Sequence, residues 1–210
     1  MVNSNPFDQY TSRYDNWYNK HEKIFESEVR AIRSVYSFTG NGIEIGVGTG
    51  RFAQALGIEN GLEPSRNMSE LARKRGINVI EGNAENIPVK DHVYHYCLMV
   101  NTLCFLDDVD KAMSEIRRVT TKNGEIIIGY INKNSLLGKK YRDKKEDNIF
   151  YKNARFYSNK EIRNILLDNN FKIIQNVNTL FGDIENIQEV QPVKSGYGEG
   201  GFVVTKAQKI

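Results

Sequence analysis

Long apolar runs are missing from this sequence. Among its 210 residues the apolar runs, such as Ile126–Ile128, are far too short to span a bilayer. The first residues, 1–6, contain no basic segment followed by an apolar one, which is the pattern of a secretory signal. We therefore expect neither a membrane partner nor a signal peptide.

Cysteine is scarce as well. The two cysteines, Cys97 and Cys104, lack the spacing of a metal site and fall around an expected buried strand, where a reduced thiol behaves as a small hydrophobic side chain. The acidic residues Asp107, Asp108 and Asp110 could suggest magnesium, but they begin an expected helix, where carboxylates offset the helix dipole and can cap it. The sequence thus predicts no metal site and a cytoplasmic location.

Linkers, repeats and strong net charge are also absent. No internal repeat, low-complexity block or Pro/Gly-rich stretch divides the chain, and its length suits a single α/β domain over residues 1–210. The formal net charge of +3 is by itself too small to indicate a nucleic-acid partner.

What the sequence does contain is an alternation of short apolar runs and helical patterns. This alternation predicts a Rossmann-like, doubly wound α/β fold with a sheet of seven strands, mostly parallel with an antiparallel last strand, and helices on both faces. The helices are expected near 20–37, from 51, at 66–75, from 109 and from 159, and the strands near 43–45, 58–63, 77–81, 96–100, 126–131, 171–180 and 201–206. In such sheets, ligands bind beyond the carboxyl ends of the strands.

The loop after the first expected strand holds three glycines at alternate positions. Gly46, Gly48 and Gly50 let the chain take positive φ and let a ligand approach the backbone. A dinucleotide fingerprint would place its third small residue one position later, where Arg51 stands. The offset weakens a nicotinamide or flavin interpretation without excluding it.

Five ordered segments resemble motifs of class I S-adenosylmethionine-dependent methyltransferases. The glycine loop, 44–50, has the family's acidic residue followed by Gly-x-Gly-x-Gly. The segments 61–65, 81–88, 98–103 and 117–125 resemble the family's next motifs, in order. The resemblance covers about residues 10–207 and is nearest to the type-11 group of small methyltransferases.

The resemblance implies S-adenosylmethionine as the cofactor. The carboxylate of Glu44 suits a ligand that carries a sulfonium and an ammonium group. Glu63 follows the first glycine of the loop, Gly46, at close to the ~20-residue spacing at which an acidic residue binds ribose hydroxyls. Asn83 stands where the family usually has Asp, and Tyr94-His95 where it usually has Phe-Asp. The expected cofactor-binding residues are Tyr14, Glu44, Gly46, Gly48, Gly50, Glu63, Pro64, Asn83, Ala84, Glu85 and Asn101.

Three segments are candidates for the methyl-acceptor side. Residues 1–37 resemble a helical lid, although an amphipathic helix packed on the sheet is an equal alternative. Residues 132–160 and 181–200 are expected as insertions on the ligand side, and loops as long as the second are usually functional or disordered. The substrate-side candidates are Tyr10, Trp17, Tyr151, Tyr157, Glu189 and Tyr197.

The leading hypothesis is methyl transfer to a small polar molecule. An RNA or protein methyltransferase is an alternative because residues 133–160 mix lysines with aromatics, although a solvated helix face explains that mixture better, so a nucleic-acid partner is not expected. A non-catalytic cofactor-binding module and a nicotinamide oxidoreductase are further alternatives. Because the donor is already activated by its charge, no catalytic residue is required, and none is assigned. The sequence leaves the oligomeric state open.

Overall fold

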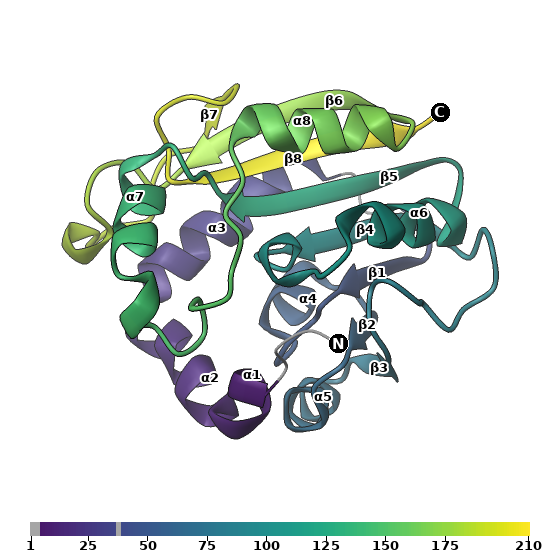
Figure 1. Cartoon of the computed structure of the whole chain (residues 1–210), viewed down its shortest axis with the longest axis horizontal. Coiled ribbons are helices and arrows are strands. Elements are labelled where there is room, and N and C mark those ends of the chain that lie inside the picture. The colour runs from purple at the N-terminus through teal and green to yellow at the C-terminus, as the bar shows by residue number, and fades with distance from the viewer. Residues whose placement is uncertain (1–4, 37–38) are drawn as a thin grey trace.

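The computed structural model describes residues 5–36 and 39–210 and shows one twisted sheet between two layers of helices (Figure 1). Its strand order is β3-β2-β1-β4-β5-β8-β6-β7. The strands are β1 Gly42–Ile45, β2 Asn60–Glu63, β3 Asn78–Glu81, β4 Tyr94–Val100, β5 Thr120–Ile131, β6 Phe171–Thr179, β7 Lys194–Ser195 and β8 Phe202–Lys209.

The strand directions match the prediction. Strands β1 to β5 pair in parallel, β8 is antiparallel to β5, and β6 is antiparallel to β8. Strand β6 therefore runs parallel to the first five, so the segment that follows it leaves on the same edge of the sheet as their carboxyl ends.

The expected count of seven strands is wrong, because the sheet has eight. The additional strand, β7, has two residues and pairs with β6 at the sheet edge. The amide of Asn178 donates to the carbonyls of Lys194 and Gly196, at 3.1 and 2.9 Å, and so holds this piece of the loop against β6. A strand this short has no periodicity that a sequence could reveal.

Helices cover both faces of the sheet. Helices α6, Val109–Val119, and α8, Asn159–Asp168, cover one face, and α3, Glu22–Val35, and α4, Arg51–Leu56, cover the other (Figure 1). The remaining helices are α1 Asn5–Gln9, α2 Thr11–Lys20, α5 Arg66–Lys74 and α7 Leu136–Asp143, with 3₁₀ turns at Leu103–Phe105, Lys145–Asp147 and Ile184–Asn186. The helix expected near 20–37 is α3, and position 37 lies outside the described residues.

Apolar side chains of the helices form the two halves of the core. Ile32 of α3 packs on one face of the sheet, and Met113 of α6 and Leu166 of α8 pack on the other, all fully buried. Side chains cap two of the helices. Ser65 accepts a hydrogen bond from the Met68 N–H at 3.2 Å, and Ser158 and Glu161 make a capping box. No helix in the described ranges is long and apolar enough to cross a membrane.

The segments expected on the ligand side gather at one edge of the sheet. Helices α1, α2 and α7 lie beyond the carboxyl ends of the parallel strands (Figure 1). This edge is where the fold places a ligand.

Candidate functional site

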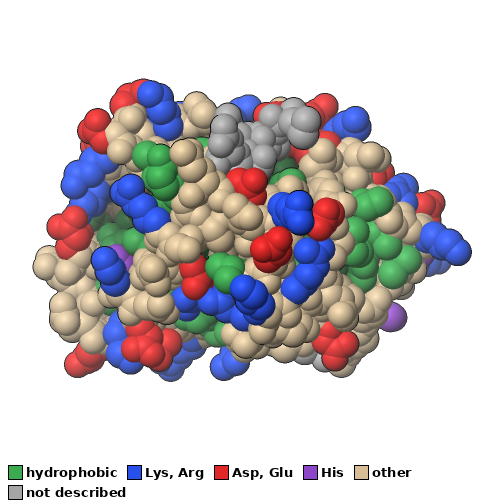
Figure 2. All heavy atoms as spheres, turned by 90° about the horizontal axis from the view of Figure 1, so that it is seen from below, with side chains coloured by type: hydrophobic (Ala, Val, Ile, Leu, Met, Phe, Trp, Pro, Cys, Tyr) green, Lys and Arg blue, Asp and Glu red, His purple; other side chains and the backbone are tan. Residues whose placement is uncertain are grey.

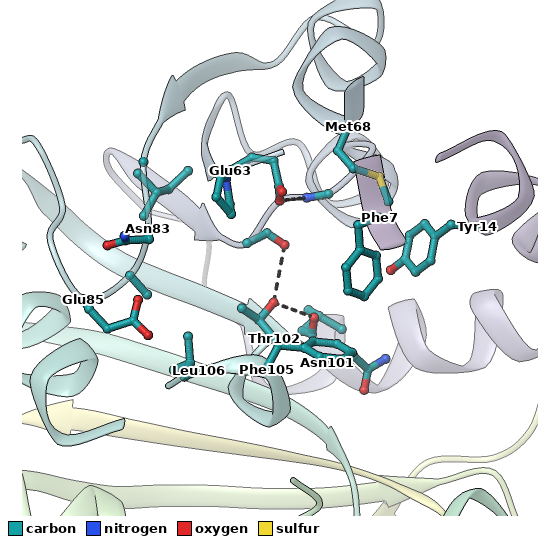
Figure 3. A pocket seen from close by; sticks show the side chains of 17 residues that line it. Phe7, Tyr14, Glu63, Met68, Asn83, Glu85, Asn101, Thr102, Phe105 and Leu106 are labelled. Atoms are coloured by element: carbon teal, nitrogen blue, oxygen red, sulfur yellow. Dashed lines mark hydrogen bonds between the residues drawn. The ribbon is translucent and has the colours of Figure 1, made fainter. Parts of the chain in front are cut away.

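A groove opens at the carboxyl ends of β1, β2 and β4, beneath α1 and α2. In Figure 3, Asn83 and Glu85 lie on one side of it and the rings of Phe7 and Tyr14 on the other, with Glu63 between them. Of the expected cofactor residues, the groove is lined by Tyr14, Gly46, Gly48, Glu63, Pro64, Asn83, Ala84, Glu85 and Asn101.

Glu63, the last residue of β2, is fixed by the backbone around it. One carboxylate oxygen accepts the Gly48 N–H at 2.8 Å, and the other accepts the Ser65 N–H at 2.9 Å. The side chain is 7% exposed, and burial raises its pKa to about 7. A carboxylate so oriented, with lone pairs still directed into the groove, is suited to accept hydrogen bonds from vicinal hydroxyls.

Two asparagine side chains in the groove have oxygens without partners. The buried Oδ1 atoms of Asn83 and Asn101 accept no hydrogen bond from any described residue. Asn101 also has a positive φ of 52°, at the point where β4 ends. Buried oxygens without a donor are costly, so these two atoms are suited to accept from a ligand.

The glycine loop divides into a part that faces the groove and a part that faces the core. At Gly48, with φ of 54°, the nearest atom to an added Cβ would be in the Tyr14 ring at 4.0 Å, which leaves the backbone open to a ligand. At Gly50, an added Cβ would lie only 3.0 Å from the backbone of Ala72. The missing side chain therefore allows the loop to pack closely against α5.

Glu44 lies behind the loop and does not line the groove. It is 1% exposed, its Oε2 has no hydrogen-bond partner among the described residues, and burial raises the pKa of its carboxyl well above the usual range. Gly50 is likewise absent from the groove lining. Glu44 and Gly50 belong to the sequence motif that identifies the loop. Both are buried beneath the residues of the loop that line the groove.

Two aspartates hold the N-terminal helices over the groove. Asp15 of α2 accepts from Arg51 and Arg75, each at 2.8 Å, and from the Thr49 hydroxyl at 2.6 Å. Burial opposes its ionisation, but the hydrogen bonds from the two arginines keep the pKa of Asp15 well below its ordinary value. Asp8 of α1 accepts from the Ser65 hydroxyl at 2.5 Å and the Asn67 N–H at 3.1 Å.

A second cavity of about 310 Å³ adjoins the groove. It lies among α2, α3, α7 and the segment 144–151, and it shares Tyr14 and Asn101 with the groove. The predicted substrate-side residues Trp17 and Tyr151 line it. Its wall also holds Glu28, a residue that the sequence did not single out.

The other substrate-side candidates lie elsewhere. Tyr10 is 39% exposed on the surface of the N-terminal segment, and Tyr157 is buried in the core, where it borders a much smaller cavity. Glu189 is exposed, and Tyr197 packs beside the α8 face of the core. Neither residue lines the groove or the second cavity.

Sequence reasoning missed the apolar part of the groove. Phe7, Met68, Phe105 and Leu106 line it together with the motif residues. Met68 closely follows the motif segment 61–65, and Phe105 closely follows the segment 98–103. This closeness is the signal that could have pointed to them. Phe7 carries no such signal, because it lies in α1, outside every motif, and reaches the groove only through the packing of α1 beside α5.

Charged side chains of both signs are interspersed on one face of the molecule. On the face shown in Figure 2, lysines and arginines alternate with aspartates and glutamates and form no broad basic area. In the part of the chain that the structure describes, no group of three or more His, Cys, Asp or Glu could hold a metal ion. Asp108 instead caps α6 by accepting from the Lys111 N–H at 3.0 Å, as expected.

Comparison with known proteins agrees with the geometry. Residues 43–128 match the family described as Methyltransferase domain. The chain is 43% identical over 206 residues to an uncharacterized protein of Methanocaldococcus jannaschii, covering 98% of this chain and 100% of that protein.

Solved structures extend the comparison. The crystal structure of a "SAM-dependent methyltransferase, possible histamine N-methyltransferase" from Thermotoga maritima is 43% identical, with a TM-score of 0.95, covering 98% of this chain and 99% of that one. A geranyl diphosphate C-methyltransferase from Streptomyces coelicolor, bound to Mg²⁺, geranyl diphosphate and S-adenosyl-L-homocysteine, has a TM-score of 0.65 at 14% identity, covering 90% of this chain and 80% of that one. That second likeness concerns the fold alone.

Proposed function

Because this chain belongs to the S-adenosylmethionine-dependent methyltransferases, we propose that it methylates a small polar molecule held in the cavity beside the cofactor groove. The observation that carries this proposal is the position of Tyr14 and Asn101, which line both spaces. The methyl group of a cofactor in the groove can therefore face a nucleophile in the second cavity, at the position of these two side chains.

The groove residues fit the chemistry of the cofactor. Glu63 would accept the ribose hydroxyls, and the unpartnered oxygen of Asn83 would accept the adenine amine. Gly46, Gly48 and Asn101 would hold the methionine part. The cofactor supplies a methyl carbon made electrophilic by the sulfonium charge, while the protein aligns the acceptor and excludes water. Glu44 and Gly50 would act behind the loop by fixing its shape.

The acceptor site is enclosed by segments remote in the sequence. The second cavity is walled by helix α2 and by residues 136–151. We therefore propose that α2 is the lid and that residues 136–151 bind the acceptor. Of the segment 181–200, only Ile184 contributes to this wall. A cavity of about 310 Å³ is suited to a small acceptor rather than to a folded RNA. The free cysteines also fit a reducing compartment such as the cytoplasm.

Thermal unfolding with added ligand tests the cofactor assignment. A ligand at 100 times its Kd stabilises the folded state by about 2.7 kcal/mol. For a chain of this size we expect S-adenosylhomocysteine to raise Tm by roughly 5–10 °C. NAD is the control and should leave Tm unchanged. A shift with NAD and none with S-adenosylhomocysteine would overturn the proposed function.

A further inference from the structure

We propose that Glu28 and the aromatic side chains around it form a binding site for a protonated amine, which makes a small amine the methyl acceptor and its nitrogen the methylated atom. The inference depends on the proposed function, whose site it specifies.

Glu28 lies in the middle of α3 and is only 4% exposed. Within residues 5–36 and 39–210, its carboxylate takes part in no hydrogen bond and no ion pair, and yet it lines the second cavity. Burying an unpaired acidic group is costly, and natural proteins normally pair such groups. Since the described residues supply no partner, a ligand in the cavity is suited to provide one.

The walls around Glu28 select for positive charge. Tyr14, Tyr18, Tyr141 and Tyr151 all lie within electrostatic reach of its carboxylate and line the same cavity, as does Trp17. Aromatic faces attract a cation, and the attraction is largest where water is excluded. An acidic group surrounded by aromatic rings is therefore suited to an ammonium group.

The charged residues at the rim do not compete for this position. Arg13, Lys144 and Asp147 line the cavity but are exposed, so water screens them. Glu28 is the buried acidic group of the cavity wall. An ammonium group beside it would favour its ionised form and pair with it, whereas a substrate carboxylate or phosphate would oppose its ionisation.

The position of Glu28 also suits the proton balance of the reaction. Near neutral pH the Glu28 carboxyl is mostly protonated in the free protein, because burial raises its pKa to about 8. A protonated amine that binds beside it releases that proton to water, and the amine then gives one of its own protons to the Glu28 carboxylate, which frees the nitrogen lone pair. The lone pair forms a bond to the methyl carbon of the cofactor while the bond from that carbon to sulfur breaks, its electron pair remaining on sulfur. The products are an N-methylammonium ion and S-adenosylhomocysteine, and Glu28 again holds a proton, as in the free protein. Glu28 would thus both bind the acceptor and take up its proton.

Matched ligands test the charge requirement. We would measure binding of 2-phenylethylamine, tyramine and histamine to the S-adenosylhomocysteine complex by calorimetry, with 2-phenylethanol and 3-phenylpropionate as neutral and anionic controls. We expect the best amine to bind at least tenfold more tightly than either control. With S-adenosylmethionine in place of the product, the same amine should be methylated on nitrogen.

Two variants on one helix test the residue. Glu28→Gln should lower amine binding and kcat/KM by about 100-fold while leaving S-adenosylhomocysteine binding within twofold. Glu22→Gln is the matched control, since Glu22 is exposed on the same helix and should leave both unchanged. Equal amine binding by wild type and Glu28→Gln, or tighter binding of the alcohol or the acid, would overturn the inference. Failure of S-adenosylhomocysteine itself to bind would instead overturn the proposed function.

Discussion

Glu63 carries a carboxylate that titrates near neutral pH. Burial raises its pKa to about 7, so it is mostly protonated below that pH and ionised above it. The ionised form is the stronger acceptor for hydroxyl groups. We therefore expect S-adenosylhomocysteine affinity to increase as pH rises through about 7, and Glu63→Gln to lower it by about 10- to 100-fold and remove this part of the pH dependence. Calorimetry across that range checks both, with the exposed Glu59→Gln as control. An unchanged pH profile in Glu63→Gln would contradict the role.

Without a bound ligand, the buried carboxyl of Glu28 should lower the free energy of unfolding. Burial raises its pKa from 4.5 to about 8, so the unfolded chain loses this proton at a lower pH than the folded chain. The free energy of unfolding of the wild type should then fall as pH rises between those two values. At about 1.4 kcal/mol per pH unit, Glu28→Gln should gain about 3–5 kcal/mol relative to wild type across that window. Urea unfolding near both ends of the window measures this gain, and Glu22→Gln should show none. A difference between Glu28→Gln and wild type that is the same at both ends would show that the carboxyl is not desolvated.

At the scale of elements, the Asp15 carboxylate joins α2 to the glycine loop and to the helices that follow it. Asp15 accepts from Arg51, Arg75 and Thr49, and its side chain is 14% exposed. In Asp15→Asn, two partly buried arginines lose their charged partner, and we expect a loss of about 1–3 kcal/mol in stability. Amide exchange in residues 11–20 should accelerate, and S-adenosylhomocysteine should bind about tenfold more weakly because Tyr14 loses its support.

The control for this prediction is Asp143→Asn, an exposed change in α7. Asp143→Asn should alter neither amide exchange in α2 nor cofactor affinity. Faster exchange spread over all helices of Asp15→Asn, rather than concentrated in α2, would contradict a local role.

The elements also show how far a sequence can be interpreted. Strand directions, the cap of α6 and the groove position of Glu63 were predictable because they depend on local spacing and on ordered motifs. Phe7 and Glu28 were not, because each reaches the site through long-range packing and looks locally like an ordinary helix residue. Glu189 was placed on the correct edge of the sheet, but the loop that carries it turns along β6 to form β7 and leaves the side chain in solvent.

For the whole molecule, the distribution of charge predicts little affinity for nucleic acid. The net charge is +3, and on the face shown in Figure 2 the two signs are interspersed. A basic stretch at 139–145 is accompanied by acidic residues, and Lys140 is already paired with Asp183 and Glu185 at 3.0 and 2.7 Å. Counterion release therefore offers little gain, and we expect no binding of a single-stranded RNA at about 150 mM salt and no inhibition of methyl transfer by it. Fluorescence anisotropy with a labelled oligonucleotide measures the first, and a competition assay the second. Salt-sensitive binding in the concentration range of turnover would mean that a basic surface on another face acts as the acceptor site.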